Sequence, residues 1–296
     1  MMTKKIIGKW TWVYGILIMT SVFAGNDVFG ENNKTNQIIS LWPENPKIKL
    51  EVFLPQSSLN TGTGIVVCPG GAYGQVVVEK EGYEIAQWLN SIGAAAFVLS
   101  YHITTDSKIP SYPWPIKDGR KAVSIVRCRA AQYGIKPDKL GIMGFSAGGH
   151  LASTVGTHWQ KASPDELVND VSCRPDFMVL LYPVISFKKT YGHMGSRQNL
   201  IGSEPNESLV EELSNELHVD GNTPPSFLVH ATDDKAVPVE NSIMFYSALK
   251  NTGVSTELHI FSRGGHGFGL GFSTGYSCDW RQECVEWMRD LKFLNK

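Results

Sequence analysis

Ser146 stands in the sequence GFSAG, which matches the pattern G-x-S-x-G. In that pattern a serine occupies a sharp turn between a strand and a helix, and the glycines remove side chains that would otherwise collide there. The apolar run LGIMG before the serine suits a buried strand, and the small residues after it can begin a helix packed on a sheet. The spacing predicts a nucleophile, although the motif alone does not exclude a chance match in a chain with 29 glycines.

A serine hydroxyl needs a base before it can act as a nucleophile at neutral pH, and His266 is the candidate. It lies in RGGHGFG, just after the last expected strand, where the flanking glycines let a loop bend back over the strand ends. An isolated loop histidine usually has no catalytic role. The position after the final strand is what favours one for His266.

The base in turn needs a carboxylate to hold its tautomer and to stabilise the imidazolium. The segment HATDDKAVP, after the strand expected at 226–231, offers two adjacent aspartates. Neighbouring side chains at a strand end point in different directions, so only one of them is expected to reach the base. The spacing H-x-x-x-D-x-x-V-P favours Asp234 and leaves Asp233 as a turn or capping residue. The resulting order Ser146, Asp234, His266 is the chain order of α/β-hydrolases.

A fourth feature is CPGGAYG at residues 68–74, directly after the strand expected at 64–68. Attack on an ester generates an oxyanion, and each backbone donor held against it contributes about 3 kcal/mol. We expect the N–H groups of Gly71, Ala72 and Ala147 to form this oxyanion hole. An ordinary glycine-rich turn is the alternative, whereas a phosphate loop would require a Lys-Ser/Thr ending that the segment lacks.

Alternating strand-like and helix-like runs must position these residues. Strands are expected at 47–54, 64–68, 94–99, 140–144, 177–181, 226–231 and 256–261, and helices at 81–91, 115–133, after residue 146, at 239–251 and at 279–294. Repeated strand–helix units predict a mainly parallel, doubly wound sheet with helices on both faces and with the strand ends gathered along one edge. The predicted fold class is therefore α/β, with the α/β-hydrolase fold. We expect one catalytic domain over residues 40–296, in which 183–225 forms a cap-like insertion over the site.

Composition and charge exclude several other classes of protein. The 296 residues are 42% hydrophobic and 19% charged, with a formal net charge of −1, values typical of a globular enzyme. No run of basic residues favours nucleic acid or an anionic membrane surface as a partner. The five cysteines show no metal-binding spacing, and a disulfide between Cys278 and Cys284 would require the intervening segment to turn back. Serine chemistry needs neither metal nor cofactor, so we expect none, and the oligomeric state stays open.

The N-terminus has a separate pattern. Lys4, Lys5 and Lys9 precede an apolar stretch over residues 10–24 that ends in small residues, as in a secretory signal peptide. A membrane span needs about 20 apolar residues, so a retained anchor is the less favoured alternative. We expect residues 1–24 to be cleaved on export to the periplasm or beyond, with no stable membrane insertion afterwards, and residues 25–39 to form a linker.

With these residues identified, the chain resembles secreted bacterial α/β-hydrolase carbohydrate esterases related to acetylxylan esterases, the xylanase-associated esterase group. The resemblance spans about residues 40–294 and is carried by VVCPGGAYGQVVVEKEGYEIAQWLNSIGAAAFVLSYH, DGRKAVSIVRCRAAQYGIKPDKLGIMGFSAGGHLAS, HATDDKAVPVENS and GGHGFGL. The triad and oxyanion-hole residues named above fall on the corresponding positions of that group. One departure is Tyr101-His102, where relatives usually carry Tyr-Arg, and the change bears on how this loop is held.

The resemblance implies a serine esterase that removes acetyl groups from plant polysaccharide, with acetylated xylan as the expected substrate. Tyr73, Trp114 and Trp280 are candidates to offer flat faces to sugar rings, although aromatic residues more often pack in a core. A feruloyl or other aryl esterase is an alternative that differs only in its acyl pocket. An inactive, carbohydrate-binding protein on a hydrolase scaffold is the non-enzyme alternative, and the intact serine and histidine disfavour it.

Overall fold

The computed structural model describes residues 37–106, 109–271 and 277–295. These residues belong to one compact unit. The predicted signal peptide at 1–24, and residues 25–36 of the predicted linker, lie outside the described residues. Among the helices that are described, none is long and apolar enough to cross a membrane.

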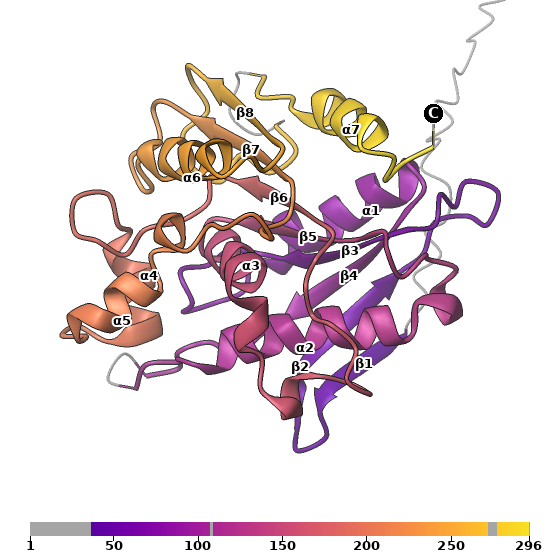
Figure 1. The fold of residues 1–296 in the computed structure, drawn as a ribbon, viewed down its shortest axis with the longest axis horizontal. Helices are drawn as coiled ribbons and strands as arrows, with labels where there is room; N and C mark the ends of the chain where they lie inside the picture. Colours follow the sequence, from indigo (N-terminus) through magenta and orange to yellow (C-terminus); the bar gives the residue numbers. More distant parts are fainter. Residues whose placement is uncertain (1–36, 107–108, 272–276, 296) are drawn as a thin grey trace, which may run out of the picture. The chain divides into compact units, whose positions relative to one another are not determined.

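The centre of this unit is an eight-stranded sheet (Figure 1). The strands are β1 (Ile38–Trp42), β2 (Asn45–Phe53), β3 (Thr63–Cys68), β4 (Ala94–Ser100), β5 (Leu140–Phe145), β6 (Phe177–Leu181), β7 (Ser226–Ala231) and β8 (Thr256–Phe261). They lie in the order β1-β2-β4-β3-β5-β6-β7-β8. The pairs β1–β2 and β2–β4 are antiparallel, and all the others are parallel. The predicted mainly parallel, doubly wound sheet is confirmed.

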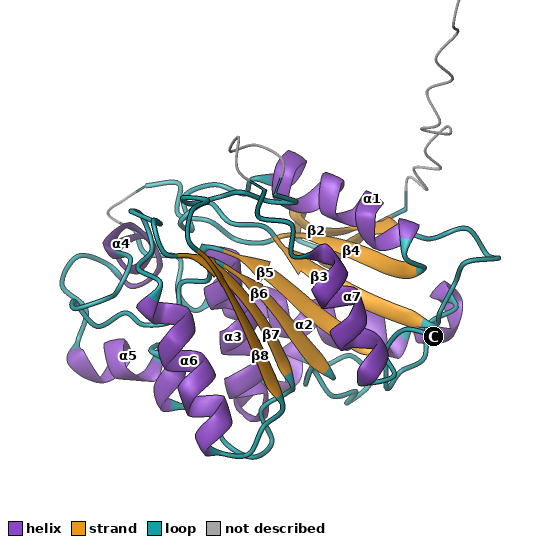
Figure 2. Cartoon of the chain, turned by 90° about the horizontal axis from the view of Figure 1, so that it is seen from above, coloured by secondary structure: helices purple, strands orange, loops and turns teal. Residues whose placement is uncertain are grey.

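Helices cover both faces of the sheet (Figure 2). On one face lie α2 (Trp114–Cys128), α3 (Ala147–His158) and α6 (Glu240–Asn251), and on the other α1 (Glu84–Ser91) and α7 (Arg281–Asp290). Successive strand residues point to opposite faces. Ile65 and Val67 of β3 therefore join the cluster under α1 and α7, whereas Val66 joins the cluster under α2 and α3. Burial on both faces explains why β3 is an almost continuous apolar run in the sequence.

Some element boundaries differ from the predicted ones. The helix expected at 81–91 begins as a π-helical turn, Glu79–Tyr83, before α1, and the helix expected at 115–133 ends at Cys128 and is followed by a 3-10 turn, Ala130–Tyr133. Gly134 then takes a φ of 64°, the left-handed conformation that ends such a turn. The strand β1 had not been expected at all; it is a short edge strand in which two of five residues are exposed.

Residues 183–225, the predicted cap-like insertion, connect β6 to β7. They contain α4 (Met194–Ile201), α5 (Glu207–Glu212) and a 3-10 turn, Asn215–Leu217. In Figures 1 and 2 the two helices lie beside α6 at one end of the molecule. This segment is held to the main body partly by Asn241 of α6, whose side-chain oxygen accepts the backbone N–H groups of Ile185 and Ser186 at 2.9 and 3.0 Å.

All five cysteines are free thiols. The disulfide considered for Cys278 and Cys284 is not formed, and the Cys278 thiol instead donates to the backbone oxygen of Arg263 at 2.9 Å. Four of the thiols are buried, and Cys128 is partly exposed. Burial raises the pKa of Cys173 to about 11 and raises those of Cys68 and Cys284 further. These thiols therefore pack as small apolar groups.

Candidate active site

Ser146 occupies the turn between β5 and α3. Its φ of 51° and ψ of −118° are unusual for a residue with a side chain, and the surrounding packing must maintain them. Its N–H donates to the carbonyl oxygen of Leu181 at 3.1 Å. A Cβ atom at Gly148 would lie 2.0 Å from the backbone oxygen of Cys68, so α3 can approach the end of β3 only because this residue is glycine. The sequence GFSAG thus forms the strand–turn–helix that its pattern predicts.

His266 lies between the serine and a carboxylate. Its Nε2 is 2.8 Å from Ser146 Oγ, and its Nδ1 is 2.6 Å from Asp234 Oδ2. The three residues follow β5, β7 and β8, whose carboxyl ends meet at one edge of the sheet. The structure therefore brings together the serine, histidine and aspartate proposed from the sequence. A hydroxyl, an imidazole and a carboxylate in such a chain are the groups that general-base activation of a serine requires.

Asp234 is held in place from two sides. Its Oδ1 accepts the backbone N–H groups of Ala236 and Val237, both at 2.9 Å, and its Oδ2 faces His266 and the buried His230, whose Nε2 is 3.3 Å away. Burial acts to raise the pKa of Asp234, but the hydrogen bonds from His230 and His266 outweigh it and hold the pKa well below its ordinary value. The carboxylate is therefore ionised at neutral pH. Sequence reasoning had included His230 in a spacing pattern without assigning it a contact.

Asp233 has a different contact from its neighbour. Its Oδ1 accepts the backbone N–H of Gly265 at 2.8 Å, which ties the loop after β7 to the loop that carries His266. The two adjacent aspartates thus do different things, because one faces the imidazole and the other fastens the backbone of the imidazole's loop. The structure places Asp234, and not Asp233, against the histidine.

The loop after β3 lies against the serine turn. A Cβ atom at Gly70 would be only 3.0 Å from Ser146 Cβ. Ala72 follows in the left-handed region, with a φ of 54°. In the described part of the chain, no acceptor takes the N–H groups of Gly71, Ala72 and Ala147. Free backbone donors are what an oxyanion hole requires, and the role of these three residues in one stays a prediction.

A buried carboxylate connects this loop to the histidine loop. Glu81 Oε2 accepts the N–H of Gly70 at 2.8 Å, and Oε1 accepts the Tyr182 hydroxyl at 2.8 Å. The same hydroxyl oxygen accepts the N–H of Gly269 at 3.1 Å, and the Tyr182 ring packs edge-on to His266 at 5.0 Å between centroids. Burial raises the pKa of Glu81, although the tyrosine and glycine hydrogen bonds act to lower it. Sequence reasoning missed this bridge, because a glutamate in EKEGYE resembles an ordinary helix surface residue.

Two other contacts fix the loop after β3. The Tyr101 hydroxyl donates to the backbone oxygen of Pro69 at 2.6 Å, and Asn199 Nδ2 of α4 donates to the backbone oxygen of Ala72 at 2.8 Å. The insertion therefore touches the loop that carries two of the expected oxyanion donors. His193, at the N-terminal end of α4, accepts the backbone N–H of Ser196 at its Nδ1, and burial lowers its pKa. Sequence reasoning did not reveal this contact between Asn199 and the loop after β3.

Two of the three aromatic residues proposed to bind sugar are wrongly assigned. Tyr73 is completely buried, and its hydroxyl lies 2.8 Å from His150 Nδ1. Trp280 is also completely buried, and its indole N–H donates to the backbone oxygen of Gly269 at 2.9 Å. Neither ring has a face free for a sugar. Trp114 is 44% exposed and packs edge-on to Trp42 at 6.0 Å, so its role in binding stays a prediction.

His102, the departure from the usual Tyr-Arg, has a structural partner. Its backbone N–H and its Nδ1 lie 2.7 and 2.8 Å from Oδ2 of the buried Asp118. The other oxygen of Asp118 accepts the Trp42 indole N–H at 2.7 Å. The imidazole therefore fastens the segment after β4 to α2, and it does so at the edge formed by β1 and β2.

The mainly parallel sheet, with its candidate site at the carboxyl ends of the strands, defines the class of the protein by its fold, the α/β-hydrolase fold. Residues 50–249 match the family model BD-FAE, and the chain belongs to this family. In a solved structure, the acetyl ester-xyloside bifunctional hydrolase from Caldicellulosiruptor lactoaceticus is 40% identical, with a TM-score of 0.79, over 88% of this chain and 98% of that one. The predicted fold class and esterase group are confirmed.

Two curated relatives have similar levels of identity. An acetylxylan esterase of Xylanibacter ruminicola is 36% identical over 249 residues, which are 83% of this chain and 48% of the relative. Endo-1,4-beta-xylanase B of Butyrivibrio fibrisolvens is 36% identical over 217 residues, which are 72% of this chain and 34% of the relative. The chain thus spans less than half the length of each of these relatives.

Proposed function

We propose that this chain is a serine esterase that removes acetyl groups from plant polysaccharide through an acyl-enzyme intermediate on Ser146. The observation that carries the proposal is the continuous contact from Ser146 Oγ through His266 to Asp234, with distances of 2.8 and 2.6 Å. In such a chain the ionised carboxylate keeps the histidine proton on Nδ1, so that Nε2 is free to accept the serine proton.

The reaction then takes two stages. In the first, Ser146 Oγ attacks the acetyl carbonyl carbon while its proton passes to His266 Nε2, and the carbonyl oxygen becomes an oxyanion facing the free N–H groups of Gly71, Ala72 and Ala147. The tetrahedral intermediate collapses, the sugar oxygen leaves with the proton from His266, and the acetyl group stays on the serine. In the second stage a water molecule repeats the attack with the same base, acetate is released, and the serine recovers its proton.

The polysaccharide substrate is supported by what the relatives are called. One relative is named an acetylxylan esterase and another an acetyl ester-xyloside hydrolase, and both match most of this chain. Their names join an acetyl ester to a xylose-based carbohydrate. Asn199 of the insertion contacts the backbone oxygen of Ala72, so the insertion borders the loop after β3, where a bound sugar would have to lie.

The test is acetate release from acetylated xylan by the wild-type chain and by Ser146→Ala, beside 4-nitrophenyl acetate and methyl ferulate. We expect acetate from xylan, little turnover of the ferulate, and a loss of roughly 10³-fold or more in Ser146→Ala with folding intact. Full activity in this variant would overturn the mechanism. Rapid turnover of methyl ferulate without acetate release would instead identify an aryl esterase, and no turnover of any ester would indicate a binding protein.

A further inference from the structure

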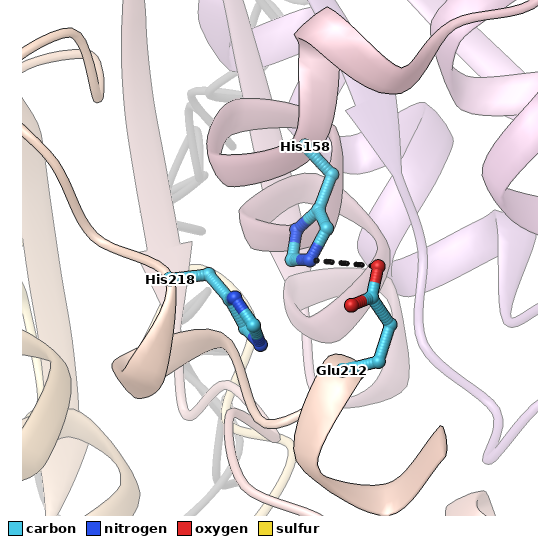
Figure 3. A group of neighbouring side chains, drawn as sticks. All are labelled: His158, Glu212 and His218. Atoms are coloured by element: carbon cyan, nitrogen blue, oxygen red, sulfur yellow. Dashed lines mark ion pairs between the residues drawn. The ribbon is translucent and has the colours of Figure 1, made fainter. Parts of the chain in front are cut away.

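A second group of chemically active side chains lies away from the triad. His158 at the end of α3, Glu212 at the end of α5 and His218 just beyond offer ligand atoms that all lie within 4.8 Å of one another (Figure 3). His158 Nε2 is 3.6 Å from Glu212 Oε1, and the two imidazole rings are 4.6 Å apart between centroids. No metal was expected from the sequence, because these residues have no recognisable metal-binding spacing.

The hydrogen bonds of His158 fix its tautomer. Its Nδ1 is 2.8 Å from Thr157 Oγ1, and that hydroxyl donates its own proton to the backbone oxygen of Ser153 at 2.8 Å. The proton of the imidazole must therefore be on Nδ1, where it is donated to the threonine. Nε2 is left with a lone pair, and in the described residues this buried atom has no hydrogen-bond partner.

Glu212 and the lone pair of His158 form an unfavourable pair without a cation between them. A carboxylate oxygen and an unprotonated imidazole nitrogen both carry negative charge density, and a buried polar atom without a partner costs about 1–3 kcal/mol. The remaining ring, His218, has Nε2 at 2.9 Å from the backbone oxygen of Glu211. A ring nitrogen that faces a carbonyl oxygen must carry the proton, so the lone pair of His218 is on Nδ1.

We propose that His158, Glu212 and His218 bind a divalent transition-metal ion, with Zn²⁺ as the best match. Two neutral imidazoles and one carboxylate are a frequent zinc ligand set, and each imidazole has its other N–H held by a protein oxygen, as metal-bound histidines usually do. Tetrahedral zinc with bonds of about 2.0–2.1 Å separates its ligand atoms by about 3.4 Å. The 3.6 Å between His158 and Glu212 is close to that separation.

The surroundings leave room for the ion and for its fourth ligand. His158 and Glu212 line a cavity of about 360 Å³ between α2, α3 and α5, which provides an entry path and space for a water molecule. Among the described residues, two cations contact the ligand residues. Arg120, which is paired with Glu166, donates to the backbone oxygen of His158 at 2.7 Å, and Lys161 Nζ is 2.5 Å from Glu212 Oε1. The Lys161 side chain is 54% exposed, so it can turn into solvent when a metal ion takes its place. A bound ion would join α5 of the insertion to α3 of the main body.

The experiment is calorimetric titration of the full, EDTA-treated chain with ZnCl₂. We expect one ion per chain, with affinity at least about tenfold weaker in His218→Ala and in Glu212→Gln, each of which removes one ligand. The matched control is His259→Ala, because His259 also faces a glutamate, Glu257, at 2.5 Å but has no third partner in the cluster. Affinity should be unchanged in this control.

A gain in affinity separates a metal site from a merely structural cluster. Lys161→Gln removes the cation that competes for Glu212, so it should strengthen Zn²⁺ binding severalfold while the fold stays intact. Melting curves of each variant without metal check that it is folded. The proposal is overturned if the wild-type chain binds no zinc, if the two ligand variants bind as tightly as the wild type, or if Lys161→Gln binds more weakly.

Discussion

Replacing Asp234 by asparagine tests the acid of the proposed triad at Oδ2, the atom that faces His266. Asparagine can keep its oxygen on the N–H groups of Ala236 and Val237, which Asp234 Oδ1 accepts at 2.9 Å. Its NH₂ group must then face His266, where an acceptor stood before. The imidazole can accept a hydrogen bond from this NH₂ group only if its own proton moves from Nδ1 to Nε2. In that tautomer Nε2 cannot accept the proton of Ser146. A wrong tautomer of this kind costs about 10⁴-fold in kcat, or about 5.5 kcal/mol of activation free energy.

The stability of the same variant should change much less. His230 Nε2 loses Asp234 as a neighbour but still has the backbone oxygen of Val237 at 3.0 Å, and the side chain of His266 is 26% exposed and can be hydrated. We expect a loss of about 1–2 kcal/mol in the free energy of unfolding, which lowers the melting temperature by a few degrees. The substitution should therefore reduce the rate far more than it reduces the stability.

The assay is steady-state hydrolysis of 4-nitrophenyl acetate with thermal unfolding measured beside it. The matched control is Asp233→Asn, since an asparagine oxygen can still accept the N–H of Gly265 that Asp233 accepts at 2.8 Å. It should retain kcat within about tenfold. The reasoning is refuted if Asp234→Asn keeps kcat within tenfold of the wild type, or if the Asp233 variant loses as much.

Three more changes follow from contacts described above. Tyr182→Phe removes the hydroxyl that bridges the two loops, so kcat should fall about tenfold with little change in KM. The free energy of unfolding should fall by about 1–3 kcal/mol. A variant with wild-type kcat would show that the bridge is irrelevant to catalysis. Burial lowers the pKa of His150 from 6.5 to about 4, so between these values the unfolded chain binds a proton that the folded chain does not. The free energy of unfolding should therefore fall as the pH falls, and this group should contribute about 2 kcal/mol of the loss at pH 5. Urea unfolding at pH 7 and pH 5 should show a smaller loss of stability in His150→Gln than in the wild type. Equal losses would contradict the lowered pKa of His150. Gly148→Ala places a Cβ atom 2.0 Å from a backbone oxygen and should cost about 3 kcal/mol, whereas Gly221→Ala, with open space around it, should be nearly neutral in the same melting assay. Equal melting temperatures for these two variants would rule out the clash.

The strands were predictable where both of their faces are buried. β3, β5, β6 and β7 are completely buried along their length, so their sequences are mainly apolar runs that local pattern alone identifies. β1 has no such run, since as a short edge strand it is stabilised by pairing with β2 rather than by its own sequence pattern. Helix ends were less accurate, because the π-helical and 3-10 turns beside α1 and α2 depend on packing that a periodic pattern does not record.

The site was predictable to the extent that its residues lie in motifs. Ser146, Asp234 and His266 each follow a strand in a glycine-rich or aspartate-rich turn, and the structure brings them into contact. The bridge between Glu81 and Tyr182 joins residues about a hundred positions apart, and no local pattern marks either of them. For the aromatic residues the difficulty is different. A tyrosine or tryptophan in a loop can face a ligand or the core with the same sequence, and only the packing decides which.

The buried thiols have a practical consequence for anyone who works with this protein. In the folded chain only Cys128 is partly accessible, so a maleimide or iodoacetamide should label one position quickly and leave the other four untouched. Burial also keeps Cys68, Cys173 and Cys284 as unreactive thiols by raising their pKa values. Each molecule that opens exposes them all at once. Counting labels over time by intact mass spectrometry therefore measures the rate of global unfolding. The measurement requires no substrate, no engineered probe and no denaturant.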